Sequence, residues 1–140
     1  MSFREKSTWI TFLLILGVFG IFFFEAGLHL FSPTHRYHND LMLFLALVVV
    51  IVVLEVVLHI IVAARSPKDA NTPQDERERL IALKATRPAF FVLMVGSVLA
   101  IATIHLGWGP VLILHSVLFA IWIAELTRNG VKLYYYRRDA

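Results

Sequence analysis

The fold is decided by residues 41–64, which read LMLFLALVVVIVVLEVVLHIIVAA. Only Glu55 and His59 interrupt this apolar run. The run is longer than the roughly 20 helical residues that are needed to cross about 30 Å of hydrocarbon. A half-buried helix of a water-soluble protein would place polar residues at a period of about 3.6, and no such pattern is present. The segment therefore predicts a transmembrane helix.

Three further apolar runs have the same character. They cover residues 9–31, 89–106 and 111–130, and the segment Gly107-Trp108-Gly109-Pro110 separates the last two. Lipid offers no hydrogen-bond partner to a bare backbone, so a spanning segment must be a helix or a strand of a closed barrel. Barrel strands alternate apolar and polar residues, which these runs do not. We therefore predict an all-α polytopic membrane protein in which residues 1–140 form one domain with four transmembrane helices.

The composition supports a lipid environment and excludes several kinds of chemistry. Hydrophobic residues make up 59% of the chain and charged residues 16%, more apolar surface than one water-soluble core can hide. The chain has no cysteine, which excludes disulfides, thiolate metal sites and thiol nucleophiles. Its net charge of +3 comes from basic residues next to the apolar runs. Anionic lipid head groups, and not nucleic acid, are their expected partners.

The distribution of Lys and Arg predicts the orientation. Arg36 alone lies between the first two spans, and the other twelve basic residues lie on the opposite side. Since cytoplasmic segments of membrane proteins are enriched in Lys and Arg, both termini and the 65–88 loop are expected in the cytoplasm. The twelve are Arg4, Lys6, Arg65, Lys68, Arg77, Arg79, Lys84, Arg87, Arg128, Lys132, Arg137 and Arg138.

The 65–88 loop contains signals for a helix of its own. Thr72-Pro73-Gln74-Asp75 places a capping residue, a proline and an acid in the order typical of a helix start. We predict a short amphipathic helix over 73–87 that lies on the membrane surface and leads into the third span with a kink near Pro88. This helix and the Tyr-rich basic tail after residue 130 are candidate binding surfaces for a protein partner.

Small residues on two of the spans predict close helix contacts. Ser116, Ala120 and Ala124 recur every fourth residue on the fourth span, and Gly96 and Ala100 do so on the third. Such spacing puts small side chains on one face, where neighbouring backbones can approach closely. We expect the protein to form a homo-oligomer, so the contact lies either within one chain or between copies.

The second half of the chain resembles a group of small bacterial inner-membrane proteins that are themselves uncharacterised. The resemblance rests on residues 75–84, which read DERERLIALK, and on a following span, a short hairpin and a last helix with Ala124-Glu125-Leu126 and Tyr136-Arg137-Arg138. It implies four helices in a bacterial inner membrane. It implies no activity and no ligand residue.

Seven ionisable residues lie inside the apolar runs, where a charge costs roughly 2.5–3.5 kcal/mol, so such groups are expected to face the bundle interior and find partners. With the predicted orientation, four of them fall in the outer half of the membrane. One carboxylate and three imidazoles suit a transition metal such as zinc, copper or iron. The alternative is that these groups are wetted at the interface or hydrogen-bond a neighbouring helix. The four candidate ligands are Glu25, His29, His105 and His115.

The other three, Glu55, His59 and Glu125, fall between the midplane and the cytoplasmic side. They predict either a proton relay or a polar clamp between helices. Glu125 has the further option of an ion pair with Arg128 or Arg77. A haem held by His29 and His105 or His115 is a less favoured alternative, because the chain offers one layer of histidines only.

No motif commits the chain to catalysis, so we expect no enzymatic activity. The sequence favours a scaffold or regulatory membrane protein with a polar Glu/His interior. The alternative is metal, haem or proton handling through the intramembrane Glu and His residues.

Overall fold

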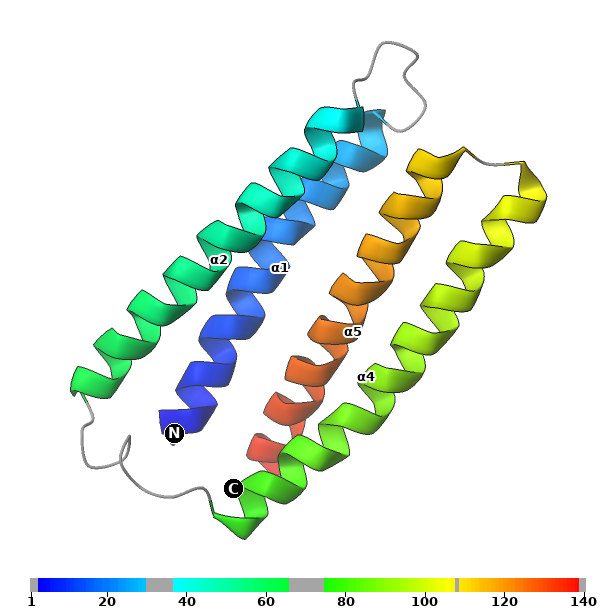
Figure 1. Ribbon diagram of the computed structural model, residues 1–140. Coiled ribbons are helices and arrows are strands. Elements are labelled where there is room, and N and C mark those ends of the chain that lie inside the picture. Colours follow the sequence, from blue (N-terminus) through cyan, green and yellow to red (C-terminus); the bar gives the residue numbers. More distant parts are fainter. Residues whose placement is uncertain (1–2, 30–36, 66–74, 108, 139–140) are drawn as a thin grey trace.

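The computed structural model describes residues 3–29, 37–65, 75–107 and 109–138, which are almost entirely helical (Figure 1). In chain order the helices are α1 (Phe3–His29), α2 (Tyr37–Arg65), α4 (Glu76–Ala102), the short 3-10 helix η1 (Thr103–Leu106) and α5 (Pro110–Arg138). Four helical segments are long and apolar enough to cross a membrane, and η1 extends the third of them. The predicted all-α fold with four spanning helices is therefore confirmed.

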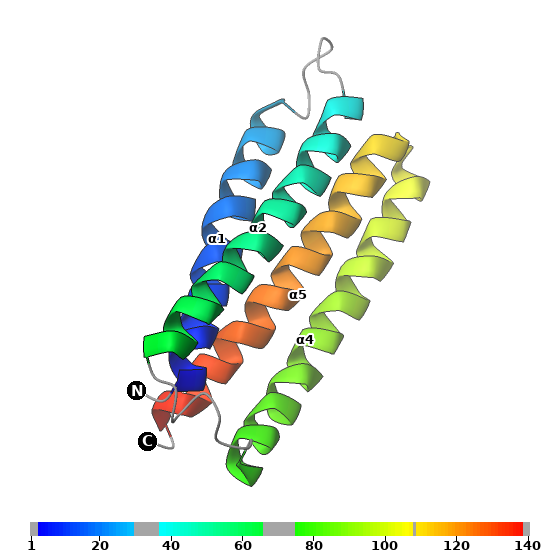
Figure 2. The same ribbon diagram turned by 60° about the vertical axis from the view of Figure 1, so that its left-hand side comes forward.

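The helices form two hairpins that lie side by side, and both ends of the described chain lie at the same end of the molecule (Figures 1 and 2). We call this the terminal end; it holds Phe3, Arg65, Glu76 and Arg138. The opposite, hairpin end holds His29, Tyr37, Leu106 and Pro110. The main packing joins α4 to α5, α5 to α1 and α1 to α2. Helices α1 and α5 are thus central, and α2 and α4 flank them.

Small residues allow α4 and α5 to pack closely. Ala100 on α4 and Ala120 on α5 are both buried. A Cβ atom added to Gly96 would lie 2.5 Å from the Cβ of Ala120, so only glycine fits at this crossing. This confirms the contact predicted from the spacing of small residues, and it places the contact within one chain.

Large apolar side chains point away from the helix contacts. Phe24 is 69% exposed, Phe91 is 71% exposed and Val49 is 62% exposed. A water-soluble protein of this size would bury most such residues in its core. An outer surface of large apolar residues around an interior of small ones is the arrangement expected when the solvent is lipid.

Aromatic rings join the two hairpins near the middle of the molecule. The Phe23 ring of α1 lies 5.1 Å from Trp122 and 5.3 Å from Phe119, both on α5. On the other side of α1, Phe44 of α2 lies 5.1 Å from Phe19. The indole N–H of Trp122 donates a hydrogen bond of 3.0 Å to the Ile15 carbonyl of α1. Lipid offers no hydrogen-bond acceptor for the indole N–H, so this bond stabilises the packing of α5 against α1.

The predicted helix over 73–87 is present from Glu76 onward and leads into the third span. Its residues are the first turns of α4, which continues through Pro88 to Ala102. Pro88 removes one hydrogen bond, to the Lys84 carbonyl, yet Ala85 and Ala89 on either side of it are both buried. Packing on both sides of the proline holds the helix continuous. The predicted cap at Thr72 and Pro73 lies outside the described residues.

The C-terminal tail is likewise part of a spanning helix, because α5 runs to Arg138. Arg4 Nε of α1 lies 2.6 Å from Glu78 Oε2 of α4. The Lys84 ammonium group lies 5.1 Å above the Tyr135 ring. These contacts hold the terminal ends of α1, α4 and α5 together, so the tail is not a free arm.

Candidate functional site

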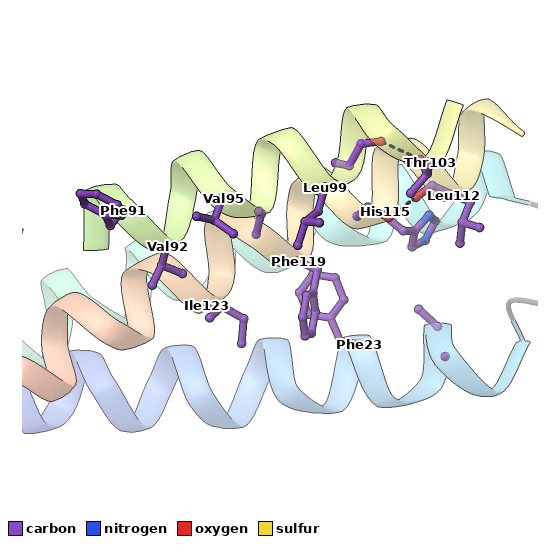
Figure 3. Close-up of a pocket in the computed structure, with 16 residues that line it drawn as sticks. Phe23, Phe91, Val92, Val95, Leu99, Thr103, Leu112, His115, Phe119 and Ile123 are labelled. Atoms are coloured by element: carbon purple, nitrogen blue, oxygen red, sulfur yellow. Dashed lines mark hydrogen bonds between the residues drawn. The ribbon is translucent and has the colours of Figure 1, made fainter. Parts of the chain in front are cut away.

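A groove of about 730 Å³ lies between α1, α4 and α5 (Figure 3). Its lining residues lie between Phe91 and Ala100 on α4, at Thr103 of η1, between Leu112 and Ile123 on α5, and at Phe23, Ala26 and Gly27 on α1. Figure 3 shows α1 and α4 on opposite sides of the space, with Phe23 and Phe119 reaching into it. Its volume is within the roughly 300–1,000 Å³ typical of small-molecule sites.

The groove exists because α1 and α4 both pack on α5, which separates them. Its lining includes small residues, among them Gly96, Ala120 and Gly27. A Cβ atom added to Gly27 would meet no other atom within 4 Å, so the space beside this residue is open. Leu99, on the α4 side, is 63% exposed. The groove therefore opens sideways, on the surface that spanning helices present to lipid.

The polar side chains of the groove gather toward its hairpin end. The Thr103 hydroxyl donates to the Ala100 carbonyl at 2.6 Å, and the Ser116 hydroxyl donates to the Leu112 carbonyl at 2.7 Å. A hydroxyl has one hydrogen and two acceptor lone pairs. Since both hydrogens are used within the helices, the two hydroxyl oxygens remain as hydrogen-bond acceptors.

His115 is buried between these hydroxyls and α2. Its ring lies next to a carboxyl group of α2 that is outside the groove lining. Its Nδ1–H donates to the Val111 carbonyl at 2.9 Å, and its Nε2 lies 3.5 Å from Asp40 Oδ2. A carbonyl can only accept, so Nδ1 carries a hydrogen. Nε2 is therefore the ring nitrogen that faces the carboxyl group. The contact joins α5 to α2 at the hairpin end of the molecule.

A second histidine contact lies toward the terminal end. His59 Nδ1–H of α2 donates to the Glu55 carbonyl at 2.6 Å, and its Nε2 forms a short hydrogen bond with the Ser7 hydroxyl of α1. The contact joins α1 to α2, as the predicted polar clamp requires. Glu55 takes part through its backbone, and its carboxylate forms no ion pair with the described part of the chain.

The four predicted metal ligands do not come together. His115 is buried beside Asp40, whereas Glu25, His29 and His105 are exposed. Within residues 3–29, 37–65, 75–107 and 109–138, no three His, Asp or Glu side chains are grouped so that they could hold a metal ion. Metal or haem binding stays a prediction from sequence, and the part of the chain that the structure describes shows no grouping of ligands for it.

Glu125 pairs with Arg128, one turn along α5, at 3.2 Å and 3.5 Å. This is the ion pair that the sequence offered as an alternative to a proton relay. Both side chains are more than 40% exposed, so the pair contributes little stability.

Sequence reasoning missed two partners, Asp40 and Ser7. Asp40 directly precedes the apolar run of α2, and this position resembles an ordinary loop residue; the structure places it in the first helical turn. Ser7 is a small polar residue before the first span. Neither has a local signal for its role, because each partner lies on a helix distant in sequence.

Four apolar helices, a surface of large apolar side chains and a lateral groove define a polytopic α-helical membrane protein. The chain belongs to the family described as Predicted membrane protein (DUF2178), whose model matches residues 4–140. The match extends over the first half as well as the second. No curated protein and no solved structure matches the chain.

Proposed function

We propose that this protein is a non-enzymatic membrane protein with a scaffold or regulatory role, and that it acts by binding a hydrophobic molecule in the lateral groove. The observation that carries the proposal is the groove itself, which is almost wholly apolar and opens on the lipid-facing surface. Its polar side chains donate their hydrogens to their own helices or pair with Asp40, as in a site that binds and does not react.

The proposed setting is a bacterial inner membrane with both termini in the cytoplasm. The charge distribution supports this orientation, because the described basic residues lie at or toward the terminal end of the helices. With this orientation the polar part of the groove faces the outer leaflet, and the Arg4–Glu78 contact lies at the cytoplasmic side.

Proton or metal transfer has less support. The Asp40–His115 and Ser7–His59 contacts lie toward opposite ends of the helices. Between them stands the aromatic cluster of Phe22, Phe23, Phe44, Phe119 and Trp122. The two polar contacts are better explained as fixed helix–helix contacts on either side of a hydrophobic core.

Filling the groove tests the proposal. Gly27→Leu places a side chain in the open space beside α1, where an added Cβ atom meets nothing within 4 Å. We expect native mass spectrometry of the wild-type protein, extracted in mild detergent, to detect a retained lipid, and the variant to lose most of it. Gly17→Leu is the matched control, since Gly17 lies on the same helix, outside the groove and also in open space. Equal retention by all three proteins would contradict the proposal.

A further inference from the structure

We infer that the groove binds the alkyl chain of a membrane amphiphile whose uncharged head group carries a free hydroxyl. This inference rests on the proposed function and names the chemistry of the bound molecule. Three features of the groove carry it: its length, the position of its polar groups, and the donor and acceptor roles of these groups.

The length of the groove fits one alkyl chain. Its lining on α4 and η1 runs from Phe91 to Thr103, which is about 18 Å at the roughly 1.5 Å rise of a helical residue. One leaflet of the hydrocarbon core is about 15 Å thick. The groove begins near the hairpin end and stops well before the terminal ends of α4 and α5 at Glu76 and Arg138. A chain that entered from the adjacent leaflet would fill it.

The same length argues against a helix from a second copy as the occupant. A spanning helix must pass through about 30 Å of hydrocarbon and would need a seam over this whole distance. Beyond Phe91 and Ile123 the groove lining ends, and the α4–α5 contact continues with Ala85 and Ala89 buried. The groove therefore suits a shorter, flexible occupant.

The polarity of the lining matches an amphiphile. Thr103, His115 and Ser116 are grouped near the hairpin end, and the lining from Phe91 to Leu99 is apolar. An amphiphile would place its apolar chain against the apolar lining and its polar head group against the polar side chains. The described lining contains no Lys or Arg, and its histidine, His115, already faces the Asp40 carboxyl group, so this end of the groove offers no compensating cation to an anionic head group.

The hydrogen bonds select the head group. Thr103 and Ser116 already donate to the Ala100 and Leu112 carbonyls, so their oxygens can only accept from a ligand. A phosphate or carboxylate, which only accepts, would find no donor among these groups and no compensating charge. A hydroxyl group can donate to either oxygen, and each bond contributes about a few-fold in affinity.

A pair of defined probes tests the inference. Monooleoylglycerol carries two free hydroxyls, and its dimethyl ether has the same chain with none. Binding of each probe to the full-length protein in detergent is measured by native mass spectrometry titration. We expect the wild-type protein to bind the hydroxyl probe about five- to tenfold more tightly than the ether, as one to two hydrogen bonds would give. In Thr103→Val/Ser116→Ala this preference should disappear, while binding of the ether is unchanged.

The outcomes separate the inference from the proposed function. Equal binding of both probes by the wild-type protein, with loss of both in Gly27→Leu, would overturn the hydroxyl inference and leave the groove as a binding site. Binding of neither probe above the Gly27→Leu background would overturn both. A wild-type dimer that excludes the probes and dissociates in Gly27→Leu would identify a second copy as the occupant and overturn the inference.

Discussion

At the scale of single residues, the contact between His115 and Asp40 determines how the His115 ring is oriented at the polar end of the groove. The Nδ1–H of the ring is held by the Val111 carbonyl, which directs Nε2 toward Asp40. Asp40 also lies in the first turn of α2, where a carboxylate is favoured by the helix dipole. The contact therefore joins α2 to α5, and it fixes the orientation of a ring that lines the groove.

Removing this partner should destabilise the protein. In Asp40→Ala the buried Nε2 of His115 loses its polar partner, and we expect a loss of about 1–3 kcal/mol in the free energy of unfolding. Asp40→Asn should recover most of it, because the amide N–H can donate to Nε2 of a neutral ring. Thermal unfolding of the three proteins in detergent, followed by circular dichroism, measures the difference. If Asn destabilises as much as Ala, a hydrogen bond to Nε2 is not what stabilises the contact.

At the scale of helices, the α4–α5 pair depends on one glycine. Gly96→Ala would place a methyl group 2.5 Å from the Cβ of Ala120, and the two backbones must separate to admit it. Overpacking of this kind costs about 1–3 kcal/mol, which exceeds the gain of roughly 1 kcal/mol in helix propensity.

The matched change Gly17→Ala adds the same methyl group to α1 at a position with nothing within 4 Å. We therefore expect Gly96→Ala to lower the unfolding temperature and Gly17→Ala to leave it unchanged or raise it, as measured by circular dichroism in detergent. If both variants behave like the wild-type protein, the close crossing of α4 and α5 is incorrect.

The spanning helices and their small-residue contact could be predicted from sequence, because both depend on local patterns. A long apolar run such as 41–64 and the spacing of Gly96 and Ala100 are visible without knowing the fold. The helix before the third span was also visible, and the kink was predicted at Pro88 because a proline usually interrupts a helix in water. Here buried alanines on both sides of it pack against neighbouring helices, which outweighs the loss of one hydrogen bond.

The groove could not be predicted in the same way. Its lining comes from three helices, and no local sequence pattern indicates which helices are neighbours. The sequence drew attention to Glu25, His29 and His105 because charge is rare in apolar runs, yet these side chains are exposed. His115 alone of the predicted ligands lines the groove, and its partner Asp40 lies on α2, 75 residues earlier in the chain, where no local pattern links the two.

At the scale of the whole molecule, the orientation in the membrane follows from charge and can be tested directly. The chain has no cysteine, so a single one can be introduced at each end. Gly109 at the hairpin end and Arg138 at the terminal end are both exposed. A membrane-impermeant maleimide added to intact cells should label Gly109→Cys and should label Arg138→Cys only after lysis. The reverse result would place the termini outside and the polar end of the groove in the inner leaflet.

The central claim is that a hydrophobic molecule enters the groove, and Trp122 can report it. Its ring lies 5.1 Å from Phe23, which lines the groove, and the chain has only two other tryptophans, Trp9 and Trp108. With these replaced by phenylalanine, a monoacylglycerol brominated near the end of its chain should quench Trp122 fluorescence in a saturable manner. Quenching should fall in Gly27→Leu and persist in Gly17→Leu. Quenching that rises without saturation, and equally in all three proteins, would contradict the account.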